Sequence, residues 1–156
     1  EIELALRTCD SLVALMNPGF HESKWTDQEI GLALGRGLLI IPVRMGQDPY
    51  GFIGKFQAIT VTDFNTLAED IFDSLLKNKK TSKKIAYAVI YKFENSDSFD
   101  DAKINIKLVD RIEFWDKKLV RKLKSAGENN FQISHSFGVP GKIDSLIHNV
   151  KKKYGT

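Results

Sequence analysis

The residues best suited to chemistry are an indole and a carboxylate four positions apart, Trp25 and Glu29. Residues one helical turn apart share a face, so a helix over residues 27–34 with its first turn near Trp25 would bring them together. The start of that helix also offers unpaired backbone N–H groups and a partial positive charge. Such a site suits a flat ring joined to a sugar: the ring would stack on Trp25, and Glu29 would accept hydrogen bonds from the sugar hydroxyls.

The same segment allows a purely structural interpretation. Thr26 and Glu29 have the spacing of a helix capping box, in which the Glu29 carboxylate would accept a hydrogen bond from the Thr26 N–H. Trp25 would then pack against the first turn as a hydrophobic staple. On spacing alone this interpretation is favoured, because capping boxes are common. His21 has no Asp, Cys or second His at ligand spacing, and we treat it as a loop residue.

The elements that would position these residues belong to an α/β fold. Apolar runs at residues 11–16, 38–43 and 58–62 predict three strands, and continuous rather than alternating runs are typical of parallel strands covered on both faces. Helices are expected over residues 2–6, 27–34 and 65–76, which gives alternating helices and strands.

Two loops lie where such a sheet places its ligands. Open α/β sheets bind ligands outside the carboxyl ends of their strands. Residues 17–25 and residues 44–56 follow the first two predicted strands, and both are long for connections that usually have about 2–6 residues. Long loops at this edge favour a functional role.

The charge divides the chain into two parts. Residues 1–78 carry 6 basic and 11 acidic residues, a balance of −5, whereas residues 79–156 carry 17 and 9, a balance of +8. The change falls in residues 77–84, which contain five lysines and which we interpret as an exposed boundary between two units.

Residues 79–156 predict a small basic helical domain of unknown role. By periodicity alone residues 85–91 could be a helix or a strand, and a helix is preferred because helical patterns follow. The helices expected are therefore 85–91, 102–114, 116–126 and 140–153. Asp116 is a suitable N-cap for the third of these, and Gly127 is expected to end it. The lysines are scattered over several elements without base-stacking aromatics, so a solvated surface or a protein contact is expected rather than nucleic-acid binding.

Composition excludes several classes of protein. The chain has 156 residues, of which 42% are hydrophobic, enough for a folded core. The single Cys9 excludes an internal disulfide and a cysteine zinc site. No apolar run approaches the roughly 18 residues of a membrane span, and we expect a cytoplasmic protein.

The first part of the chain resembles bacterial TIR (Toll/interleukin-1 receptor) domains, which have a flavodoxin-like fold. The resemblance extends over about 50 residues as an ordered set, which is more specific than any short motif. The resembling segments are Cys9-Asp10-Ser11-Leu12-Val13-Ala14-Leu15-Met16, Ser23-x-Trp25-x-x-x-Glu29, Gly31-x-Ala33-x-Gly35-Arg36-Gly37, Ile40-Ile41-Pro42-Val43-Arg44, Asp48-Pro49-Tyr50-Gly51-Phe52-Ile53 and Phe56-Gln57-Ala58.

This resemblance implies an NAD+ glycohydrolase in which Glu29 is the catalytic residue. Trp25 would line the substrate pocket, with Ser23 as a further contributor. NAD+ would be the substrate, with no separate cofactor, and the products would be nicotinamide and ADP-ribose or a cyclic form. The family's roles in bacterial immunity and virulence, and its self-association, would extend to this protein. A non-catalytic TIR interaction module and a nucleoside-processing transferase of related fold remain alternatives.

A TIR domain has five parallel strands, of which this sequence supplies the last three. The resemblance therefore implies that two strands and the BB loop, which helps to form the nucleotide pocket, precede Glu1. The strand over residues 11–16 would then be an apolar edge in this chain. We expect this chain alone to bind NAD+ poorly, to have impaired activity and to self-associate.

Overall fold

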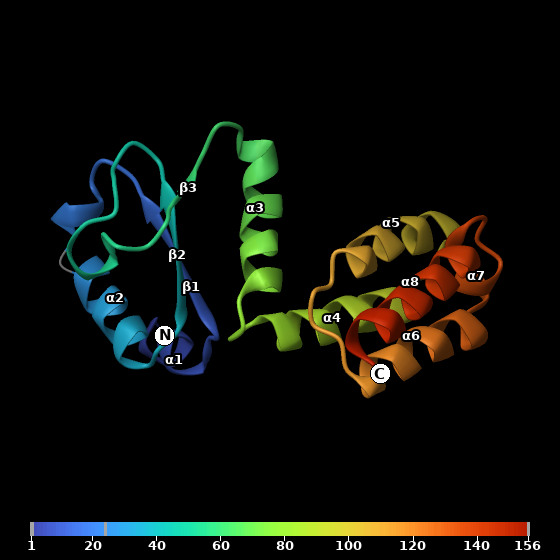
Figure 1. Ribbon diagram of the computed structural model, residues 1–156. Helices are drawn as coiled ribbons and strands as arrows, with labels where there is room; N and C mark the ends of the chain where they lie inside the picture. The colour runs from blue at the N-terminus through green and yellow to red at the C-terminus, as the bar shows by residue number, and fades with distance from the viewer. Residues whose placement is uncertain (1, 24, 156) are drawn as a thin grey trace. The chain divides into compact units, whose positions relative to one another are not determined.

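The first 81 residues fold around a three-stranded parallel sheet with the strand order β1-β2-β3. The structure is a computed structural model that describes residues 2–23 and 25–155 (Figure 1). The elements of this first unit are α1 (Ile2–Thr8), β1 (Ser11–Met16), the 3-10 helix η1 (Phe20–Glu22), α2 (Thr26–Gly35), β2 (Leu39–Arg44), the 3-10 helix η2 (Gly51–Ile53), β3 (Ile59–Thr60) and α3 (Phe64–Lys77). The predicted α/β class and the adjacency of the three strands are confirmed.

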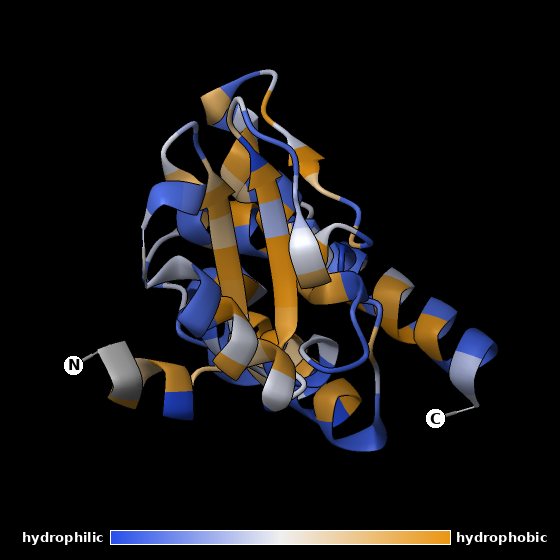
Figure 2. Cartoon of the chain, turned by 90° about the vertical axis from the view of Figure 1, so that its left-hand side faces the viewer, coloured by the Kyte–Doolittle hydropathy of each residue, from blue (hydrophilic) through white to orange (hydrophobic). Residues whose placement is uncertain are grey.

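Strand pairing follows the apolar runs of the sequence. β1 and β2 pair along their whole lengths, from Ser11 opposite Leu39 to Met16 opposite Arg44. β3 is shorter than predicted and pairs over two positions, with Ile59 opposite Val43. Figure 2 shows hydrophobic colour along most of both long strands. The two strands therefore supply most of the apolar surface that the surrounding helices can cover.

The core of this unit lies between the sheet and α2. It contains buried residues of β1, β2, α2 and η2, namely Ala14, Met16, Ile30, Ala33, Ile40 and Ile53. Figure 1 shows α2 on one face of the sheet and α3 on the other. Burying these aliphatic side chains contributes roughly 1.5–3 kcal/mol for each large one.

Strand β1 is covered on one face only. Ala14 and Met16 are buried, but Val13 and Leu15, which point to the opposite face, are 36% and 47% exposed. Four consecutive residues of β2 are buried instead. The prediction of strands covered on both faces is therefore correct for β2 and wrong for β1, whose side chains are buried only on the face that packs with α2.

From Ser82 onward the chain forms a second unit that is entirely helical. Its helices are α4 (Ser82–Glu94), α5 (Phe99–Asp110), α6 (Lys117–Asn129), α7 (Phe131–Ser134) and α8 (Val139–Tyr154). α4 packs against α5 and α6, and α8 packs against α5, α6 and α7. The fully buried side chains include Phe93, Val109, Leu119 and Leu123. The predicted helix at residues 85–91 is confirmed and is longer than expected.

A short series of hydrogen bonds between polar groups lies within this apolar core. Asn105 is buried, and its Nδ2 donates to the Ser96 hydroxyl at 3.0 Å, which in turn donates to the Phe93 carbonyl at 2.8 Å. The other amide atom, Asn105 Oδ1, has no hydrogen-bond partner within the described part of the chain. Pairing of the Nδ2 lowers the cost of placing an amide in the core.

Several helix boundaries of the second unit differ from the predictions, and α5 ends at Asp110 rather than at residue 114. α5 begins three residues before the predicted range of 102–114, because the Ser98 hydroxyl accepts the Asp101 N–H at 3.0 Å and caps it. Asp116 caps α6 as predicted, accepting the Leu119 N–H at 2.8 Å. Gly127 does not end α6, which continues to Asn129.

The lysine-rich run is the exposed boundary that the sequence predicts: its five lysines are exposed, and the chain divides into two units between Thr81 and Ser82. α3 continues to Lys77 and α4 begins at Ser82, which leaves only a tight turn between them. Thr81 in this turn is buried, and its hydroxyl donates to the Leu75 carbonyl at 2.6 Å. Lys80 Nζ donates to the Gly37 carbonyl. The Thr81 bond satisfies a carbonyl in the last turn of α3, and the Lys80 bond joins the turn to the residues that follow α2.

Candidate functional site

The candidate site is the N-terminal end of α2, where the sequence places Trp25 and Glu29. α2 begins at Thr26, and its N-cap residue Trp25 makes no side-chain capping hydrogen bond. The Thr26 hydroxyl turns back to the preceding loop and donates to the carbonyls of Phe20 and Ser23, at 2.8 and 3.0 Å. The capping-box interpretation is therefore wrong, because Thr26 is the first helical residue rather than the cap.

The three predicted site residues lie in succession along this helix start. The Glu29 N–H donates to the Trp25 carbonyl at 2.9 Å, which places the two residues one turn apart on the same face. The Trp25 N–H donates to the Ser23 hydroxyl at 3.4 Å. The structure thus brings Ser23, Trp25 and Glu29 together through one backbone hydrogen bond and the Ser23 hydroxyl.

The side chains of this group are available to a ligand. Trp25 is 67% exposed, so its indole does not act as a staple against the helix. Glu29 is half-buried, and within residues 2–23 and 25–155 its carboxylate forms no hydrogen bond or ion pair. An exposed indole and an unengaged carboxylate one turn apart form a site for a ring joined to a hydroxylated group.

The neighbouring carboxylate, Asp27, is already engaged. Tyr50 donates its hydroxyl to Asp27 Oδ1 at 2.9 Å and thereby joins the loop after β2 to the first turn of α2. Burial, followed by the hydrogen bond to Asp27, raises the pKa of the Tyr50 phenol above its ordinary value. Tyr50 also meets the Phe20 ring edge-on, with a centroid separation of 6.4 Å. The two carboxylates of the helix start therefore have different surroundings.

The two long loops meet at the carboxyl edge of the sheet, as predicted from the topology. His21 Nδ1 lies 3.2 Å from Gln47 Oε1, and the Gln47 N–H donates to the Met16 carbonyl at 3.2 Å. Gly46 has a φ of 104°, and a side chain there would also meet Pro18 at 3.4 Å. Glycine is therefore required where the second loop crosses the first.

A hollow of about 390 Å³ opens beside these loops. It is lined by Arg44, Met45, Gly46, Gln47, Asp48, Thr60, Val61 and Phe64. Arg44 is held there by an ion pair with Asp48 and donates to the Thr60 hydroxyl at 2.9 Å. Trp25 and Glu29 do not line this hollow, so the structure places a concavity where the topology predicts one, but without the predicted catalytic residue.

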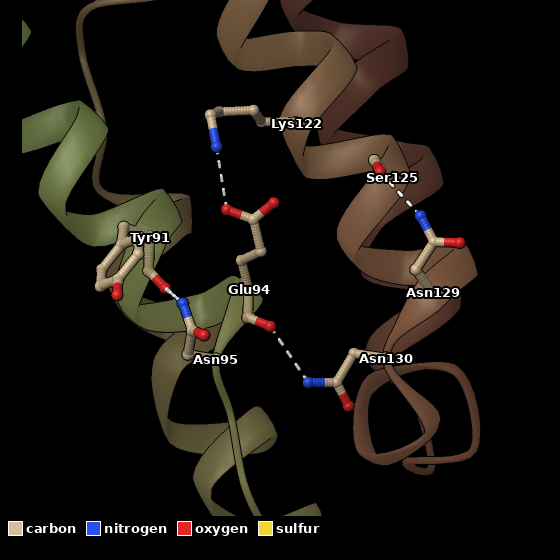
Figure 3. A network of polar contacts seen from close by, with 7 residues as sticks. All are labelled: Tyr91, Glu94, Asn95, Lys122, Ser125, Asn129 and Asn130. Atoms are coloured by element: carbon tan, nitrogen blue, oxygen red, sulfur yellow. Dashed lines mark hydrogen bonds and ion pairs between the residues drawn. The ribbon is translucent and has the colours of Figure 1, made fainter.

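A second hollow, of about 380 Å³, lies in the helical unit among Glu94, Ser125, Ala126, Asn129, Asn130 and Phe131. Figure 3 shows its polar contacts: Lys122 Nζ pairs with the Glu94 carboxylate at 3.0 Å, and Asn130 Nδ2 donates to the Glu94 carbonyl at 3.1 Å. The polar groups of this hollow are largely bonded to one another. These interactions stabilise the contact between α4 and α6, and they leave few free groups for a ligand.

Neither a metal site nor a membrane span is found in the described residues. No group of three or more His, Cys, Asp and Glu side chains there could hold a metal ion. No helix in that part of the chain has the length and apolar character required to cross a bilayer.

Sequence reasoning missed two residues that shape this edge, Tyr50 and Arg44. Their contacts join segments 23 and 16 residues apart, to Asp27 and Thr60, and such pairings are not visible in local spacing. The sequence feature that could have identified them is their position in the long second loop, because long loops at this edge favour a functional role.

Comparison of the chain with protein-family models, with curated proteins and with solved structures gave no match.

Proposed function

We propose that this protein is a TIR-type NAD+ glycohydrolase that cleaves the bond between nicotinamide and ribose, with Glu29 as its catalytic residue. The observation that carries the proposal is the pair at the start of α2, where Trp25 is 67% exposed and the Glu29 carboxylate, one turn away, has no partner among the described residues. The resemblance of the surrounding segments to bacterial TIR domains supplies the substrate, and the flavodoxin-like fold belongs to the same proposal.

The chemistry requires little beyond these groups. Cleavage of the nicotinamide–ribose bond develops oxocarbenium character at the sugar, as in glycoside hydrolysis. A carboxylate at the position of Glu29 would stabilise this positive charge and orient the ribose hydroxyls. Nicotinamide leaves as a neutral ring from a cationic precursor, so no general acid is required. The engagement of Asp27 by Tyr50 is consistent with one reactive carboxylate, since a second one is not needed.

In this proposal the other two residues of the site, Trp25 and Ser23, bind the substrate. Trp25 would stack on the flat ring of the substrate, and Ser23 would lie beside the sugar. Capture of the sugar by water would give ADP-ribose, and capture by an atom of the same nucleotide would give a cyclic form. We place this activity in the bacterial cytoplasm, in immune signalling or virulence, on the strength of the resemblance alone.

The test is nicotinamide release from NAD+ by the natural protein that carries this sequence. Glu29→Gln preserves the shape and removes the charge, and Glu22→Gln makes the same chemical change at an exposed position of η1. The proposal expects release to be lost in Glu29→Gln and retained in Glu22→Gln, with both variants showing the circular dichroism of the wild type. Equal release by the two variants would refute it.

A second candidate function, a TIR assembly module, is favoured by strand β1. β1 pairs with β2 alone among the described strands, and Val13 and Leu15 on its uncovered face are exposed. An unpaired strand edge beside an exposed apolar face promotes association with another chain. Light scattering should show that Leu15→Lys dissociates assemblies of the protein. Ile104→Lys, at an exposed position of α5, should leave them intact, and an equal effect of both variants would exclude β1 as the contact.

A further inference from the structure

The helical unit contains a groove whose walls are predominantly basic. The groove lies between α6 and α8, which pack against each other, and has a volume of about 360 Å³. Four of its six lining residues are cations and the other two are aliphatic: Lys117, Val120, Arg121, Lys124, Ile147 and Lys151. The sequence shows these cations as scattered, whereas the fold collects them on one surface.

The arrangement on α6 follows from helical periodicity. Lys117, Arg121 and Lys124 are spaced at i, i+4 and i+7, so they form one stripe beside the apolar stripe of the same helix that enters the core. Successive members of the stripe are separated by about 6 and 4.5 Å along the helix axis, given a rise of about 1.5 Å per residue. Lys151 in the last turn of α8 adds a fourth cation across the groove.

These cations are poorly compensated by acidic groups. Some basic residues outside the groove are paired: Lys122 with Glu94 at 3.0 Å (Figure 3) and Lys142 with Asp110 at 2.8 Å. Among the described residues, Lys124 is the one groove cation with an acidic partner, Glu128, at 3.5 Å and with both side chains largely exposed. Such exposed pairs contribute little and dissociate readily.

The remaining three cations of the groove, Lys117, Arg121 and Lys151, have no acidic partner within the described residues. The unit as a whole also carries an excess of positive charge. Residues 82–156 contain 15 basic and 9 acidic residues, a balance of +6. The groove therefore concentrates an uncompensated charge that attracts a polyanion.

We propose that this groove binds the phosphate backbone of double-stranded nucleic acid without sequence specificity. A duplex presents one negative charge per roughly 1.7 Å of its axis, so a stripe of cations a few ångströms apart meets several phosphates at once. None of the described residues that line the groove is aromatic, which argues against recognition of single strands, since these bind by stacking their bases on aromatic rings. Phosphate contacts of this kind fix position and do not read sequence.

The test is binding of a fluorescent 20-base-pair duplex to the protein over a range of salt concentrations. Four phosphate contacts predict that the logarithm of the association constant falls with the logarithm of the salt concentration with a slope of about −3.6. By the same relation, each of Lys117→Gln and Arg121→Gln should weaken binding about eightfold at about 0.1 M salt and reduce the slope by about 1. Two duplexes of unrelated sequence should bind equally.

Matched controls are Lys92→Gln on α4 and Lys107→Gln on α5, which remove the same charge from exposed positions outside the groove. The proposal expects these variants to bind as the wild type does. It is overturned if the controls weaken binding as much as the groove variants do, or if the slope is near zero. It is equally overturned if only single strands, anionic vesicles or an acidic protein bind. Binding can be scored without NAD+, so this result is independent of the proposed enzymatic function.

Discussion

At the scale of single residues, the two carboxylates at the start of α2 differ in what they contact. Asp27 accepts a hydrogen bond from the Tyr50 hydroxyl, whereas Glu29 is half-buried and its carboxylate has no polar partner among the described residues. Local spacing favours a capping role for Glu29, but Thr26 bonds to the preceding loop instead. A Glu29→Gln variant should therefore lose at most about 1 kcal/mol of stability, the scale of a helix-dipole contribution.

The bond between Tyr50 and Asp27 predicts a pH dependence. Burial and this hydrogen bond raise the pKa of Tyr50 in the folded protein above its unfolded value of about 10. The folded state thus binds the phenolic proton more tightly, and the resulting stability is fully present below the unfolded pKa. It is lost as the pH rises through the folded pKa.

Thermal unfolding on both sides of pH 10 measures this contribution. Tyr50→Phe should reduce the loss of stability at high pH, because the phenylalanine cannot ionise. Tyr87→Phe offers a comparison in the helical unit, where burial and the hydrogen bond to Asp116 also raise the pKa of the phenol. An identical alkaline decline in the wild type and in Tyr50→Phe would contradict the assignment.

At the scale of elements, the interior of α6 depends on a contact that its own sequence does not reveal. Gly127 lies within the helix, and a Cβ there would meet Ile143 Cδ1 of α8 at 3.0 Å. Replacement by Ala would gain about 1 kcal/mol of helix propensity but would press on α8. The glycine is therefore a point of close packing rather than a helix end.

A double-mutant cycle tests this packing role. Ile143→Val removes the methyl group that Gly127→Ala would touch, and alone it should cost about 0.5–1.5 kcal/mol. In the Gly127→Ala background it should cost less, with a coupling energy of at least about 0.5 kcal/mol from denaturant unfolding. Additive effects of the two substitutions would show that the helices do not meet at this position.

The elements also show which parts of the fold were accessible from sequence. Continuous apolar runs located β1 and β2 within one residue, and Asp116 correctly marked the start of α6. Two predictions were wrong. Gly127 does not end α6, because it packs against α8, and β3 contains only two paired residues among those described. α7 was missed because four residues carry too little periodicity to be recognised.

The candidate site was predictable to a similar degree. The succession of Ser23, Trp25 and Glu29 follows from spacing, because the start of one helix positions all three. The approach of Tyr50 to Asp27, and the basic groove between α6 and α8, require the relative placement of separate segments. Neither can be obtained from a pattern within one segment.

At the scale of the whole molecule, the chain consists of two units with separate cores, divided between Thr81 and Ser82. The helical unit has its own set of fully buried side chains, including Phe93 and Leu123. We therefore expect residues 82–156 to fold alone and to unfold cooperatively by circular dichroism. Phe93→Ala should remove about 3–5 kcal/mol and abolish the transition. A gradual, non-cooperative melt of the unmodified segment would contradict this expectation.

Steady-state kinetics of NAD+ cleavage by the natural protein tests the central proposal most directly. If Glu29 stabilises the charge that develops on the ribose, Glu29→Gln should lower kcat by about 100-fold or more with little change in KM. Trp25→Ala should mainly raise KM, by about tenfold or more, because it removes a stacking surface. A Glu29→Gln protein that retains the wild-type kcat would contradict the assignment of Glu29 as the catalytic residue.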